Sequence, residues 1–163
     1  MRRDMSTPRL LAGPALAAAL LVPVVGATSA FAAAAPANDS FNRPTSLSGC
    51  DASHENDTFD ATGQNGEPIH FLNSEPTQSV WFTFRSPVND VVTIDTQGSD
   101  FDTVLAVYRG TALDRLTRVA SDDDSGGNLT SLVSFQASAN VTYRIAVDGF
   151  LASQGNYLLQ VSC

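Results

Sequence analysis

Alternating apolar and polar positions dominate the C-terminal half of the chain. Runs with a period of two, rich in β-branched and aromatic residues, cover residues 79–85, 91–95, 103–108, 132–137, 141–148 and 157–162. Such runs predict half-buried β-strands. Polar turn clusters containing Gly, Ser, Asn and Asp separate them, which is typical of an antiparallel sandwich or barrel. The pattern therefore predicts an all-β domain.

The stretch from residue 38 to residue 78 has a weaker pattern. It is polar, is interrupted by glycine and proline, and predicts only brief extended pieces near residues 45–48 and 58–62. Residues 112–119 predict a single helical turn that leads into a strand. After residue 32, no segment keeps a helical period over three turns, so longer helices are not expected.

The first 32 residues predict a secretory signal peptide. Three arginines in the first nine residues precede an apolar run over residues 10–25, and small residues follow up to Ala30-Phe31-Ala32. A membrane anchor is the alternative, but the run is interrupted by glycine and proline and is shorter than the about 20 residues that a spanning helix needs. We expect secretion by the general route, removal of residues 1–32, an Ala/Pro spacer over 33–37 and a single domain over 38–163.

Charge and cysteine content narrow the classes of function. The chain has 9 arginines, no lysine and 17 acidic residues, and residues 33–163 have a formal net charge of −10. Nucleic-acid binding is therefore not expected, because it requires a basic patch. In an oxidising compartment, Cys50 and Cys163 are predicted to form one disulfide, with two free thiols as the alternative.

Several motifs in this order resemble the bacterial pre-peptidase C-terminal (PPC) domain. The main ones are GSDFDTVLAVYRGTAL (98–113), VASDDD (119–124), TYRIAVDGF (142–150) and GNYLL (155–159), with NDSF (38–41), GEPIH (66–70) and SVWFTF (79–84) upstream. The resemblance implies an exported, non-catalytic, jelly-roll-like β-sandwich of about eight or nine strands. In that family, relatives at the ends of bacterial collagenases bind calcium and collagen, and others bind polysaccharide.

Five aspartates form the strongest local chemical feature. Asp100 and Asp102 open one predicted strand, and the run Asp122, Asp123 and Asp124 lies in a later loop. Because Ca²⁺ prefers six to eight oxygen ligands held on loops, these carboxylates are candidate calcium ligands. Asp39 and Glu67 are weaker candidates for the same site. The alternative is a solvated acidic turn whose carboxylates bond their own backbone.

Three aromatic residues are candidates for an exposed ligand-binding platform: Trp81, Tyr108 and Phe150. Since Val80 and Phe82 are expected to face the core, Trp81 faces the other way. An outward tryptophan is either used for binding or covered. We favour burial of Trp81 under the 38–78 segment.

No catalytic motif stands out. There is no G-x-S-x-G elbow, and His70 is expected to be a hydrogen-bonded loop residue and not a catalytic base. We therefore expect a secreted, monomeric, non-catalytic module that binds an extracellular polysaccharide or protein, including a separately encoded protease. A small secreted hydrolase and a purely structural surface module are the alternatives.

Overall fold

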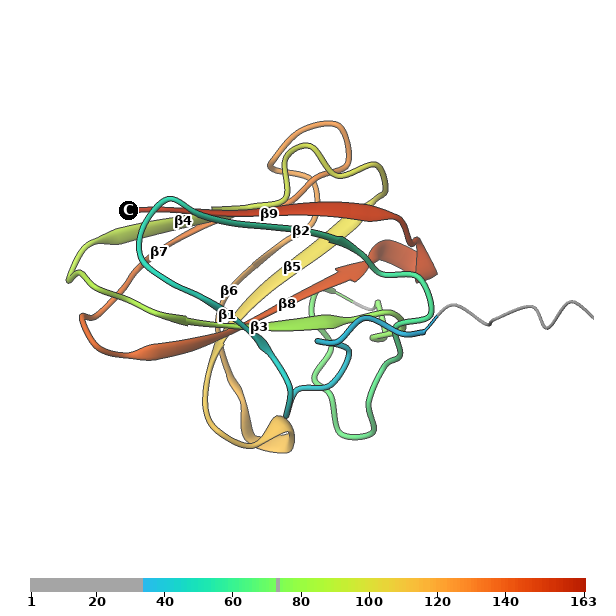
Figure 1. The fold of residues 1–163 in the computed structure, drawn as a ribbon, viewed down its shortest axis with the longest axis horizontal. Coiled ribbons are helices and arrows are strands. Elements are labelled where there is room, and N and C mark those ends of the chain that lie inside the picture. Colours follow the sequence, from blue (N-terminus) through green and yellow to red (C-terminus); the bar gives the residue numbers. More distant parts are fainter. Residues whose placement is uncertain (1–33, 73) are drawn as a thin grey trace, which may run out of the picture. The chain divides into compact units, whose positions relative to one another are not determined.

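The computed structural model describes residues 34–72 and 74–163, which form a two-layered β-sandwich (Figure 1). The predicted signal peptide lies outside the described residues. The regular elements are β1 (Thr45–Leu47), β2 (Ala52–Asp57), β3 (Val80–Arg85), β4 (Val91–Asp95), β5 (Thr103–Arg109), η1 (Leu113–Arg115), β6 (Thr117–Asp122), β7 (Leu132–Gln136), β8 (Thr142–Gly149), η2 (Phe150–Ala152) and β9 (Asn156–Ser162). The all-β class and the predicted number of strands are confirmed.

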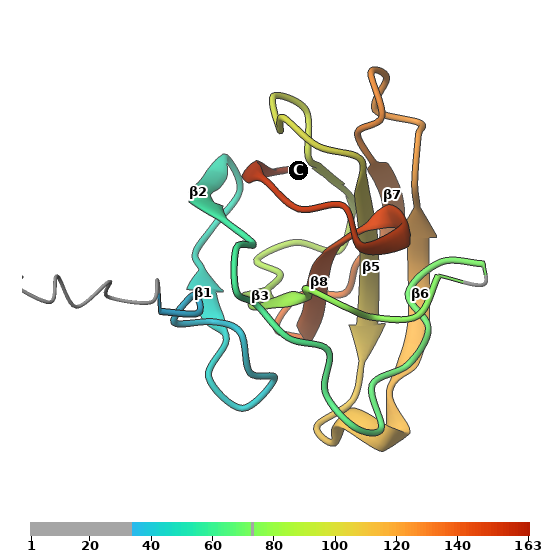
Figure 2. The same cartoon turned by 90° about the vertical axis from the view of Figure 1, so that its right-hand side faces the viewer.

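The two sheets have the strand order of a jelly roll with one added strand. One sheet has the order β1-β3-β8-β5-β6 and the other β2-β9-β4-β7, and every pair except the parallel β1–β3 pair is antiparallel. Apart from the neighbouring pair β5 and β6, which lies within one sheet, successive strands from β2 to β9 alternate between the sheets as in a jelly roll. Figure 2 shows the edge strands β1 and β2 on one side and β6 and β7 on the other.

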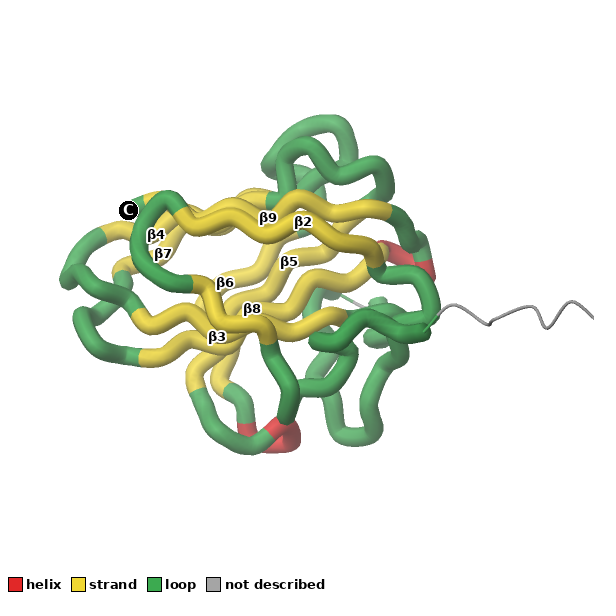
Figure 3. Tube along the Cα trace, in the orientation of Figure 1, coloured by secondary structure: helices red, strands yellow, loops and turns green. Residues whose placement is uncertain are grey.

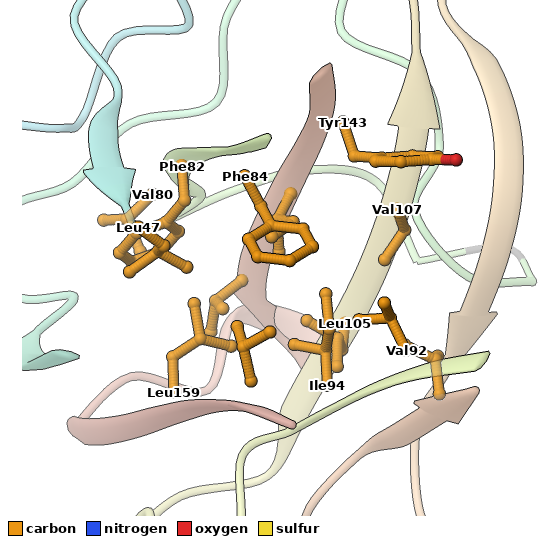
Figure 4. Close-up of a cluster of buried hydrophobic side chains, with 14 of the residues drawn as sticks. Leu47, Val80, Phe82, Phe84, Val92, Ile94, Leu105, Val107, Tyr143 and Leu159 are labelled. Atoms are coloured by element: carbon orange, nitrogen blue, oxygen red, sulfur yellow. The ribbon is translucent and has the colours of Figure 1, made fainter. Parts of the chain in front are cut away.

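The predicted alternation of apolar and polar side chains along the strands produces the core. Phe82 and Phe84 from β3 point toward Ile94 of β4 and Leu159 of β9, and all four are fully buried (Figure 4). A smaller cluster lies on the other face of the first sheet and contains Phe41, Trp81, Ala106, Tyr108 and Ala146. The segment between β2 and β3 packs against this cluster through His70, so the first sheet is covered on both faces.

Strand β2 differs from the prediction. The expected extended piece at 58–62 is a turn and an irregular segment, and the strand occupies Ala52–Asp57 instead. This edge strand contains Glu, Asn and Asp, which are depleted in strands, so its sequence has no alternating apolar signal. Its stability comes from pairing with β9, from Ala52 opposite Val161 to Asp57 opposite Asn156.

The loops separate into two ends of the sandwich (Figure 3). Loops 96–102, 123–131 and 150–155 meet at one end, which we call the acidic end. Loops 48–51, 86–90, 110–116 and 137–141 lie at the other, which we call the arginine end because Arg85, Arg109 and Arg115 lie in or directly beside them. The predicted disulfide between Cys50 and Cys163 is confirmed and lies at the arginine end.

Candidate functional site

Backbone hydrogen bonds hold the three loops of the acidic end together. The amide of Phe150 donates to the carbonyl of Asp102 at 2.9 Å, and the amide of Thr103 donates to the carbonyl of Leu129 at 3.0 Å. The side chain of Gln97 also donates to the carbonyl of Gly126 at 2.8 Å. These contacts place the start of β5 beside the loop that follows β6.

The structure brings three of the five predicted aspartates together. Carboxylate oxygens of Asp102, Asp123 and Asp124 all lie within 4.8 Å of one another. Asp102 and Asp123 are half-buried, while Asp124 is exposed. The three carboxylates therefore converge from the start of β5 and from the loop between β6 and β7, as a multidentate cation site requires.

Two oxygens of this cluster are buried without a partner. Among the described residues, no donor lies within hydrogen-bond distance of Oδ1 of Asp102 or Oδ1 of Asp123. A buried polar atom is normally satisfied by protein or water, and an unpaired charged one costs the most. The three loops of this end contain no arginine and no lysine that could compensate the charge.

Without a bound cation, burial and mutual repulsion make the charged forms of these carboxylates unfavourable. Burial and the neighbouring charges of Asp102, Asp124 and Asp122 raise the pKa of Asp123 to about 6. Burial and the charge of Asp124 also raise the pKa of Asp102. Each shift has the direction expected for carboxylates that are crowded together and partly removed from water.

The other two predicted ligands have structural roles. Asp122 accepts hydrogen bonds from the amides of Ser125 at 2.8 Å and Leu132 at 2.9 Å. Although burial opposes the effect, these bonds hold the pKa of Asp122 below its usual value. Asp122 thus organises the loop that carries Asp123 and Asp124, much as the alternative of a self-bonded acidic turn predicts.

Asp100 lies outside the cluster and joins the acidic end to β9. Its carboxylate accepts from the backbone and side-chain nitrogens of Asn156, each at 2.7 Å. Gly155 leaves room for this contact, since a Cβ there would overlap the Asp100 carboxylate. Of the five aspartates predicted as calcium ligands, Asp100 is thus bonded to β9 and lies apart from the three that cluster.

The two weaker candidate ligands are also used elsewhere. Asp39 bonds the hydroxyl of Thr62 at 3.1 Å. Glu67 accepts from the amide of Gln64 at 2.7 Å and contacts Nε2 of His70 at 2.9 Å. Neither carboxylate belongs to the cluster at the acidic end.

The prediction of an exposed aromatic platform is wrong. Trp81 and Tyr108 are 0% and 1% exposed, respectively, and pack beneath the segment that precedes β3. Phe41 meets Trp81 edge-on, with ring centroids 5.1 Å apart. Phe150 is half-buried at the acidic end and is not part of that cluster. Burial of Trp81, which the sequence favoured, is the arrangement found.

His70 is an internal structural residue. It is 1% exposed, and its two ring nitrogens contact the hydroxyl of Tyr108 at 2.8 Å and the carboxylate of Glu67. A general base must reach a substrate, and both nitrogens of this imidazole are already bonded to protein groups. His54, the other histidine, contacts the hydroxyl of Tyr157 at 3.2 Å.

Comparisons with known proteins found similarity among solved structures. A similar solved structure is the pre-peptidase C-terminal domain of collagenase from Bacillus anthracis, which covers 73% of this chain and 96% of its own chain. The sequence identity is 11% and the TM-score is 0.44. No family model and no curated protein matches the chain.

Proposed function

We propose that the protein is a non-catalytic module that acts outside the cell and is stabilised by Ca²⁺ bound at its acidic end. The observation that carries this proposal is the pair of buried, unpartnered oxygens of Asp102 and Asp123 in a cluster with Asp124. A hard divalent cation would satisfy both oxygens and remove the repulsion among the three carboxylates. Backbone carbonyls and water would complete its coordination.

Other features support action outside the cell. The Cys50–Cys163 disulfide suits an oxidising compartment, where such bonds persist. The predicted signal peptide and the resemblance of the motifs to an exported accessory domain support the same location. Within the described part of the chain, no helix has the length and apolar character needed to span a membrane.

We infer that the module contributes binding and not catalysis. His70 is enclosed by Glu67 and Tyr108, so it supports the packing of the second cluster. The chemistry available at the acidic end is cation coordination by carboxylates. An extracellular polysaccharide or protein is the expected partner, and the cation would hold the loops of one end in a single arrangement.

Titration calorimetry with calcium chloride tests the metal assignment. Wild-type protein is expected to bind about one Ca²⁺, and Asp102→Asn combined with Asp123→Asn is expected to abolish binding. Asp114→Asn is a matched control, because Asp114 is an exposed carboxylate beside Arg115 at the arginine end. Equal binding by the double variant, or no heat of binding by wild type at millimolar Ca²⁺, would contradict the proposal.

A further inference from the structure

A groove of about 420 Å³ lies at the arginine end, on the outer face of the sheet that contains β1, β3 and β8. One wall is formed by Ser46, Leu47, Ser48 and Gly49, and the rest by Thr83, Arg85 and Thr142. The strand register aligns these residues, since Ser46 lies opposite Thr83 and Arg85 lies opposite Thr142. Cys50, which follows the first wall directly, is tied to Cys163, so the wall is covalently anchored.

The groove has the opposite charge to the protein as a whole. Its lining contains one arginine and no carboxylate, although residues 33–163 have a net charge of −10. Ser46, Ser48, Thr83 and Thr142 add hydroxyl groups to the lining, and those of Ser46 and Thr83 bond each other at 3.0 Å. Leu47 is the only large apolar residue in the lining, and it is 6% exposed.

Arg85 is oriented but not neutralised. Its Nε and Nη2 donate to the backbone and side-chain oxygens of Asn140, at 3.3 and 3.0 Å. No carboxylate lies within ion-pair distance of Arg85 among the described residues. A guanidinium has five N–H donors, so those on Nη1 are free for an anionic ligand.

A second arginine flanks the same loop from the other side. Arg109 ends β5, and its Nη2 donates to the hydroxyl of Tyr143 at 2.9 Å. Strand β8 lies between β3 and β5, so the backbones of Arg85 and Arg109 are two strand spacings, or about 10 Å, apart. Arg85 lies on the outer face of the sheet, whereas Arg109 lies over the ring of Tyr143, a core residue, on the opposite face. Arg109 likewise has no carboxylate partner within the described ranges.

We propose that this groove, with Arg85 inside it, binds an acidic polysaccharide. Guanidinium groups recognise carboxylate or sulfate through paired hydrogen bonds, and the serine and threonine hydroxyls suit sugar hydroxyls. A protein partner would require exposed apolar anchors, which the groove lacks. The inference rests on the proposed binding function but not on calcium, because the groove and the carboxylate cluster lie at opposite ends.

Affinity electrophoresis of the purified protein in gels with chelator tests this assignment. Each gel contains one polymer. Hyaluronan presents carboxylates, dextran sulfate presents sulfates, dextran is neutral, and poly-glutamate is an acidic peptide. Retardation is expected from hyaluronan or dextran sulfate, and not from dextran or poly-glutamate. Arg85→Gln is expected to weaken the binding about tenfold, whereas Arg109→Gln, on the opposite face of the sheet, is expected to bind like wild type.

Arg115→Gln is the matched control, because it removes the same charge from the same end outside the groove. It should bind like wild type, and a melting curve of each variant confirms that the fold is retained. Absence of retardation by both acidic polysaccharides, equal weakening by Arg115→Gln, or equal binding of poly-glutamate would overturn the proposal. Because the gels contain chelator, these outcomes are separate from any failure of the calcium site.

Discussion

The two ends of the sandwich differ in the hydrogen-bond partners that the chain provides to their charged side chains. At the arginine end, Arg85 donates to Asn140, Arg109 donates to Tyr143, and a disulfide joins Cys50 to Cys163. At the acidic end, oxygens of Asp102 and Asp123 are buried with no donor from the described residues. The arginines thus have hydrogen-bond acceptors within the chain and stand apart, whereas the acidic end brings together like charges that the protein does not compensate.

Asp148 shows that this difference is not a general tolerance for buried carboxylates. It is 2% exposed, and its oxygens accept from the amides of Thr77, Gln78 and Gly149 at 2.8–3.1 Å. The fold therefore supplies several donors to one buried carboxylate and none to the unpartnered oxygens of the acidic cluster. The contrast indicates that the cluster requires a cation from outside the chain.

Removing the disulfide should have the largest effect on stability. Cys50→Ser combined with Cys163→Ser opens a loop with a sequence separation of 113 residues. On the chain-entropy model this costs about 4–5 kcal/mol. Denaturant unfolding should show the same loss in calcium and in chelator, because the bond lies at the arginine end. A loss that appeared only without calcium would mean that the two ends are coupled.

Asp148→Ala should have the next largest effect, about 2–4 kcal/mol, because one buried and two half-buried amides lose their acceptor. The loss should not depend on calcium. Urea unfolding in calcium and in chelator measures it, and a calcium-dependent loss would place Asp148 in the metal site.

Asp123→Asn should act only through the metal. In calcium, the variant should lose the stabilisation that the ion provides, about 2.7 kcal/mol at a hundredfold excess over the dissociation constant. In chelator it should be as stable as wild type or slightly more stable, because one repelling charge is gone. Asp100→Asn is the contrasting variant, since it breaks the contact with Asn156 and should destabilise the protein under both conditions. Thermal unfolding of both variants distinguishes the two roles.

The pH dependence gives a smaller but independent test. Because the pKa of Asp123 is raised to about 6, the metal-free folded state binds a proton more tightly than the unfolded state. This stabilising effect of protonation is lost as the pH rises from about 4 through 6. Calcium requires the deprotonated carboxylates, so its stabilisation should be full at pH 7.5 and strongly reduced at pH 5. Melting temperatures at both pH values check this, and a calcium shift of equal size at pH 5 would argue against Asp123 as a ligand.

The sequence predicted the strands whose side chains alternate between core and surface. Strands β3, β4, β5, β7, β8 and β9 lie at or within two residues of the expected positions, because burial of one face sets their period. Strand β2 could not be recognised, since pairing with β9 and not burial holds this edge strand in place. The helical turn over Leu113–Arg115 was predicted, whereas the one over Phe150–Ala152 was not.

The sequence predicted which residue type forms the candidate site, but not which of these residues contact one another. Five neighbouring aspartates indicated a cation site, yet loop conformation alone decides that Asp100 bonds Asn156 and that Asp122 supports its own loop. Burial of Trp81 under the 38–78 segment was favoured from the sequence, but burial of Tyr108 was not, because it depends on long-range packing against residues such as His70. The groove beside Arg85 depends on the parallel register of β1 with β3, which the sequence does not reveal.

Thermal unfolding of the wild-type protein in millimolar calcium, in chelator and in millimolar magnesium shows whether Ca²⁺ stabilises the acidic end. Calcium should raise the melting temperature by about 10 °C over chelator, and magnesium by much less, since Mg²⁺ demands a stricter geometry. The same melting temperature in calcium and chelator would contradict the account, and Asp102, Asp123 and Asp124 would then form an acidic turn without a metal.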